Sequence, residues 1–155
     1  MYKKRVSIIG LVLVAFIALA TIAAQRVGGE SLVGTWQVNV PEADSGLPPF
    51  QALQSFHAGG TLSETSSLLG KGEEGLAHGV WNGRGRDYLS TFQLFVFDPD
   101  GNAAGMVQVR SAITLDNQDH FTATYAVDFI APDGSVETGI DSGSYEGTRL
   151  AVVGP

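Results

Sequence analysis

The sequence predicts an all-β domain of eight antiparallel strands that close into an up-and-down barrel, preceded by an N-terminal signal or anchor helix. Beyond residue 31 the apolar stretches are short and rich in Val, Thr, Phe and Tyr, and Gly, Pro, Asn and Asp interrupt them about every ten residues. Closure into a barrel removes the two open edges of such a sheet, and no connection is long enough for a Greek-key crossover. A sandwich of two four-stranded sheets is the alternative.

Residues 1–24 have the features of an export signal. Three basic residues lie within the first five positions, and residues 6–24 carry no charge. Small residues near position 20 satisfy the cleavage requirement of signal peptidase. The apolar run is also long enough to span a bilayer, so an uncleaved anchor stays open. We expect an exported domain, periplasmic or extracellular, or one anchored in the inner membrane by residues 6–24.

A linker is expected over residues 25–32 and the barrel over 33–155. Residues 25–155 keep six of the nine basic residues and all sixteen acidic ones, which gives a formal charge of about −10. Nucleic acids and anionic membrane surfaces both bind clustered Lys and Arg, so neither is an expected partner. Membrane contact is expected only through residues 6–24 if they remain uncleaved. Cysteine is absent, so the core must hold the fold without disulfides.

The eight expected strands are separated by short polar connections. Residues 98–101 and 131–134 both contain Pro-Asp-Gly, in which Pro sets φ and Gly accepts the left-handed region. The longer polar interruptions at 41–49 and 70–75 are expected as loops at one rim. The predicted strands are 33–40, 50–58, 61–69, 77–84, 87–98, 102–116, 120–131 and 135–150.

Alternation of apolar and polar residues defines an inner face for two of these strands. In segment 33–40 the apolar face carries Trp36, and in segment 120–131 it runs from Phe121 to Phe129. Segment 87–98 differs because both of its faces are apolar. Either a loop or residues 25–32 cover one face, or this strand is the surface through which the chain forms a homo-oligomer.

Short motifs at the two ends of the domain carry a family resemblance. The first strand begins Gly34-Thr35-Trp36, and the last ends with Thr148-Arg149. The chain here resembles the calycins, the superfamily of lipocalins and fatty-acid-binding proteins. The resemblance implies that Trp36 plugs the barrel base and that Arg149 stacks on the indole to close the barrel.

The inner faces suggest a ligand site in a lipocalin-like barrel. Ligand cavities combine apolar walls with a few polar groups, so we expect a small apolar or amphipathic molecule as the ligand. The polar candidates are Gln54, Glu64 and Tyr125. The alternative to a place in the cavity is that Gln54 and Glu64 face solvent and that Tyr125 bonds a backbone carbonyl. The candidate ligand-binding residues are Gln54, Phe56, Glu64, Phe92, Tyr125 and Phe129.

Two other functions stay open, although we expect a non-catalytic protein. One is a metal-independent cyclase or isomerase resembling the allene oxide cyclase-like barrels, in which Glu64 and Tyr125 would donate or accept protons. The other is a structural barrel with a filled interior and no ligand. No metal site is expected, because the three histidines lie on different segments without ligand spacing. No nucleotide motif is present, and no cofactor is expected.

Overall fold

The computed structural model describes residues 31–43, 46–68 and 75–154. The expected signal or anchor at 1–24 and most of the expected linker lie outside the described residues. Within the described ranges, no helix is long and apolar enough to cross a membrane.

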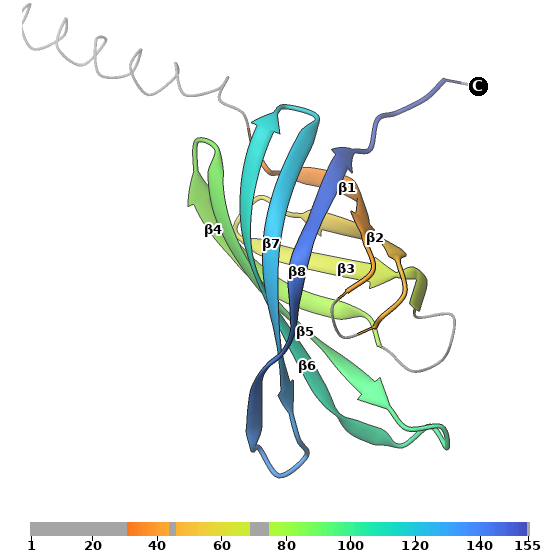
Figure 1. The fold of residues 1–155 in the computed structure, drawn as a ribbon. Helices are drawn as coiled ribbons and strands as arrows, with labels where there is room; N and C mark the ends of the chain where they lie inside the picture. The colour runs from red at the N-terminus through yellow and green to blue at the C-terminus, as the bar shows by residue number, and fades with distance from the viewer. Residues whose placement is uncertain (1–30, 44–45, 69–74, 155) are drawn as a thin grey trace, which may run out of the picture.

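The described residues form eight antiparallel strands that pair in sequence order and close into a barrel (Figure 1). The prediction of an all-β closed barrel is therefore confirmed, and the sandwich alternative is wrong. Strand ends agree closely with the expected segments, except that β3 ends at Ser66 and not near residue 69. The strands are β1 (Gly34–Val40), β2 (Phe50–Phe56), β3 (Thr61–Ser66), β4 (Ala77–Arg84), β5 (Asp87–Phe97), β6 (Ala103–Asn117), β7 (His120–Ile130) and β8 (Val136–Arg149).

The barrel closes through a short ladder between β1 and β8. Pairing runs from Trp36↔Arg149 to Asn39↔Glu146. The ladder ends at Asn39, two residues before Pro41, which has no N–H to donate to a continued ladder. Strands β5 to β8 are longer than the first four, and Figure 1 shows their two hairpins extending beyond the other strands at one end. We call that end the mouth and the end that holds Trp36 the floor.

Close approach of β7 and β8 near the floor requires a glycine. Gly147 pairs with Phe121, and a Cβ atom at position 147 would collide with the Phe121 ring. The ring therefore lies flat over the strand, where a larger residue would displace it.

A β-bulge lies on β8 opposite Asp128 of β7. Val127 pairs with Asp141 and Phe129 with Glu137, so residues 138–140 of β8 lie opposite Asp128 alone. The Asp128 side chain is buried. Arg110 donates from Nε and Nη2 to the two Asp128 oxygens at 2.9 and 3.0 Å, and the Gly139 amide donates at 3.0 Å. These hydrogen bonds, from Arg110 first and Gly139 second, lower the pKa of Asp128.

Strand β5 alternates in burial although both of its faces are apolar. Tyr88, Phe92 and Leu94 are buried, whereas Leu89 is 61% exposed and Phe95 is 55% exposed. None of the described loops covers the Leu89 and Phe95 side chains. Association through this strand stays a prediction.

Candidate functional site: a cavity behind the mouth of the barrel

The floor of the barrel is filled by aromatic side chains. Trp36, Phe56 and Phe121 are at most 2% exposed. The rings of Trp36 and Phe121 meet edge to face with centroids 4.9 Å apart, and those of Phe56 and Phe121 with centroids 6.5 Å apart. The Trp36 indole N–H donates to the carbonyl of Leu32 at 2.9 Å. Leu32, at the end of the expected linker, is fully buried and completes the floor.

Arg149 closes the floor from outside. Its guanidinium carbon lies 4.1 Å from the centre of a Trp36 ring, in a cation–π contact. The same group donates to the carbonyls of Ser31, Val33 and Gln118 at 2.6, 2.7 and 2.6 Å. The structure therefore brings together the two residues that the calycin resemblance paired, although 113 positions separate them in the sequence.

Between the floor and the mouth the barrel encloses a cavity of about 290 Å³. Its walls are mainly apolar, and a smaller number of polar side chains enter it from β2, β3, β7 and β8. This combination is typical of sites that hold a small amphipathic molecule. The apolar wall includes Val38, Ala52, Phe92, Leu94, Val107 and Val109.

Three polar side chains meet deep in the barrel. Gln54 and Ser111 are each 4% exposed and Tyr145 is 6% exposed. Their Oε1, Oγ and Oη atoms have no hydrogen-bond partner among the described residues. Such atoms destabilise the folded state by about 1–3 kcal/mol each when they stay unsatisfied. Of these three residues, Gln54 and Tyr145 also line the cavity.

Tyr145 is held in its protonated form. Burial raises the pKa of Tyr145 to about 12, and the negative charge of Glu64 adds to that rise. Ser111 and Gln54 lie close enough to oppose the rise, but they form no well-oriented hydrogen bond with the phenol. At neutral pH the phenol is therefore a hydrogen-bond donor, and its oxygen can also accept.

Two carboxylates contribute to the cavity wall. Glu64 lies opposite Gln54 in the β2–β3 ladder, so their side chains share the inner face. Asp141 lies on β8, where it accepts a hydrogen bond of 3.5 Å from the Tyr125 phenol. Among the described residues that line the cavity, none is Lys, Arg or His. The charged side chains among the described lining residues are therefore both acidic.

The structure distributes the expected site residues over two levels of the barrel. Gln54, Glu64, Phe92 and Tyr125 line the cavity. Phe56 lies in the floor, packed against Phe121 and Trp81. Phe129 lies beyond the bulge and outside the described cavity lining.

Sequence reasoning missed three polar residues near the cavity. Ser111 shares the inward parity of Ile113 and Leu115, which could have indicated its position. Tyr145 and Asp141 lie in a stretch rich in Gly and Ser, where no apolar alternation distinguishes the two faces of the strand.

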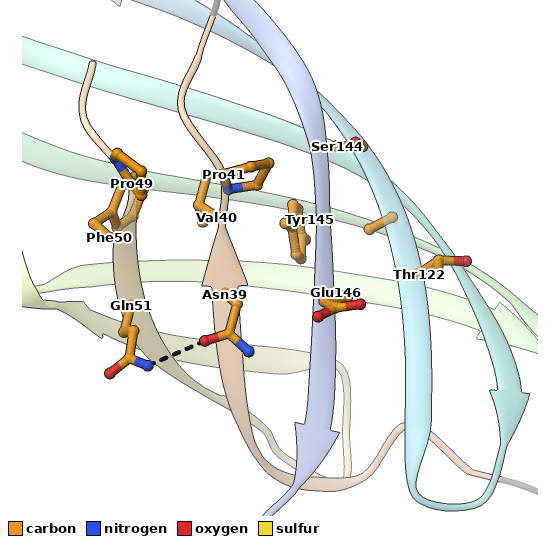
Figure 2. A pocket seen from close by; sticks show the side chains of 11 residues that line it. Asn39, Val40, Pro41, Pro49, Phe50, Gln51, Thr122, Ser144, Tyr145 and Glu146 are labelled. Atoms are coloured by element: carbon orange, nitrogen blue, oxygen red, sulfur yellow. Dashed lines mark hydrogen bonds between the residues drawn. The ribbon is translucent and has the colours of Figure 1, made fainter.

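A second, open hollow of about 530 Å³ lies at the seam between β1 and β8 (Figure 2). Polar side chains in its lining include Gln51, which donates to Asn39 on the neighbouring strand at 3.1 Å. Val40, Phe50 and Tyr145 line both this hollow and the interior cavity. At the seam these three side chains separate the hollow from the interior cavity. The interior cavity remains the better site because it contains the buried polar atoms.

The three histidines lie apart from the cavity. His57 contacts the Ser63 hydroxyl at 3.2 Å, and His120 contacts Asp116 at 2.7 Å. In the described ranges no group of three or more His, Asp or Glu side chains is arranged to hold a metal ion.

Comparisons of the chain with protein-family models, with curated proteins and with solved structures find no match. The closed eight-stranded antiparallel barrel is consistent with the calycin resemblance of its first and last strands.

Proposed function

We propose that this chain is an exported, lipocalin-like protein that binds a small amphipathic molecule in the cavity of its barrel. The observation that carries the proposal is the pairing of an apolar cavity of about 290 Å³ with buried polar atoms that lack a partner among the described residues. A bound polar group would satisfy the atoms of Gln54 and Tyr145, the two of these residues that line the cavity, and the apolar wall would hold the rest of the molecule. The same cavity argues against a barrel with a filled interior.

The cavity volume limits the size of the ligand. At the ~30 Å³ that one water molecule occupies in the liquid, about ten non-hydrogen atoms fit into the cavity. A single-chain molecule of this size with one polar end fits a cavity that has mainly apolar walls and has Gln54 and Tyr145 at its inner end.

Direct titration of the purified protein with octan-1-ol by calorimetry tests the proposal. We expect saturable binding at one site per chain. Ala52 lines the cavity, so Ala52→Leu should fill part of it and weaken binding by about tenfold or more. Ala112 faces outward on β6, and Ala112→Leu is the matched control that should leave binding unchanged. Absence of binding, or equal binding by both variants, would contradict the proposal.

One observation favours an enzyme as the second candidate. Glu64 and Tyr145 both line the cavity, so a carboxylate and a proton donor share one site. In this version Tyr145, and not Tyr125, would work with Glu64. Mass spectrometry of small amphipathic molecules recovered after incubation with the protein distinguishes the enzyme from the binding protein. Chemical conversion that disappears in Glu64→Gln would favour the enzyme, and unchanged molecules would favour the binding protein.

A further inference from the structure

We propose that the cavity selects molecules with a positively charged, hydrogen-bond-donating head group, a primary ammonium above all, and rejects carboxylates. This inference rests on the proposed binding function and adds the chemical class of the ligand. Three features of the cavity carry it: its charge, the hydrogen-bonding character of its buried atoms, and the separation of its polar and apolar parts.

The charge of the cavity disfavours an anionic head group. Glu64 and Asp141 line it, and none of the lining residues that the structure describes is basic. A carboxylate would bring a third negative charge to a cavity that already holds Glu64 and Asp141, and like charges repel. An ammonium group at Gln54 would instead be attracted by Glu64, which pairs with Gln54, and more weakly by Asp141 nearer the mouth, and this attraction offsets part of the free energy needed to remove the ammonium from water.

The buried polar atoms also favour a donor. Gln54 Oε1 is an acceptor that finds no donor among the described residues. The oxygen of Tyr145, which also lines the cavity, can accept a hydrogen bond as well. An ammonium group has three donors and no acceptor, so it can satisfy both atoms together. A carboxylate has only acceptors and would leave Gln54 Oε1 without a partner.

The positions of these groups orient the ligand. Gln54 pairs with Glu64 across β2 and β3, and Tyr145 lies near both side chains. A head group at Gln54 and Tyr145 therefore lies beside the Glu64 carboxylate. The chain of the ligand then lies along Phe92, Leu94 and Val107, which belong to the apolar wall.

Three ligands of equal chain length test the inference by calorimetry at neutral pH: octylamine, octan-1-ol and octanoate. We expect octylamine to bind about tenfold more tightly than octan-1-ol, and octanoate to bind about tenfold more weakly. The Glu64→Gln variant should lose about tenfold in octylamine affinity and keep its octan-1-ol affinity within about twofold. Glu146 is exposed on the outer face, so Glu146→Gln is the matched control and should behave as the wild type.

The outcomes separate this inference from the proposed function. If octan-1-ol binds and octylamine binds no more tightly, or if octanoate binds best, the head-group inference is wrong and the binding function stands. If none of the three ligands binds, both are wrong. If Glu64→Gln does not fold, Asp141→Asn is the second test. Loss of either carboxylate should lower the affinity for octylamine more than the affinity for octan-1-ol.

Discussion

The floor and the mouth half of this barrel are built from the same eight strands but are packed in different ways. At the floor, Trp36 and Phe121 meet edge to face and neither is measurably exposed. Toward the mouth, Val107, Val109 and Tyr125 are only partly buried and surround a cavity. One half stabilises the fold and the other leaves room for a ligand.

This difference shows that the alternation of inward and outward side chains along a strand does not determine how completely those side chains fill the barrel interior. Along β7 the inward side chains pass from Phe121 through Ala123 to Tyr125 without a change in parity. Filling depends on how much volume the neighbouring strands add at each level. Large rings from β1 and β2 reach Phe121, whereas Ala52 and Ser66 leave space nearer the mouth.

The largest effect is expected at the floor. Trp36→Ala removes the ring that contacts Phe121 and Arg149, so the free energy of unfolding should fall by about 3–5 kcal/mol. Urea denaturation followed by circular dichroism measures this change. Trp36→Phe keeps an aromatic ring in the floor and should lose less. A loss below about 1 kcal/mol for Trp36→Ala would show that the floor is not the stabilising half.

A second substitution tests how tightly the floor is packed. Gly147→Ala places a methyl group where the Phe121 ring lies, so it should destabilise the protein by about 1–3 kcal/mol in the same denaturation assay. Gly154 has open space around its Cβ position, and Gly154→Ala is the control. Equal stabilities of the two variants would mean that the floor adapts to added volume.

A substitution in the mouth half should raise the free energy of unfolding, whereas those in the floor lower it. Gln54→Leu replaces a side chain whose buried Oε1 lacks a partner, so the free energy of unfolding should rise by about 1 kcal/mol. Binding of octylamine should weaken in the same variant. Thermal denaturation and calorimetry together measure this exchange of stability for binding. A variant that is both less stable and still binds would contradict the role given to Gln54.

The smallest effect is expected outside the barrel, at Asp128. Its pKa is lowered in the folded state, so its stabilisation is complete above the unfolded pKa of about 3.9 and is lost as the pH falls through the lower folded value. Asp128→Asn should therefore be less stable than the wild type near pH 6, and the difference should shrink toward pH 2. Melting temperatures across this range measure it.

Arg110→Gln provides the matching control for that titration. Arg110 makes the largest contribution to the lowered pKa of Asp128, so this variant should show the same reduced dependence on pH. A difference between wild type and Asp128→Asn that stays constant down to pH 2 would assign the effect to packing and not to charge.

Much of the fold could be predicted from the sequence because each strand carries its own local signal. Turn residues separate the strands, and alternation placed Gln54 and Glu64 on the inner face that the structure gives them. The cavity itself could not be predicted, because its volume depends on side chains from many strands at one level. The bulge at Asp128 was equally hidden, since it arises from the register between β7 and β8.

Closure between β1 and β8 also imposes an order on folding. The ladder that joins them pairs residues from opposite ends of the domain, with Trp36 beside Arg149. Contacts this distant in sequence form slowly, because a long loop must close first. During synthesis Trp36 therefore cannot contact Arg149 until the last strand has been made. The barrel can close only when almost the whole domain has emerged from the ribosome.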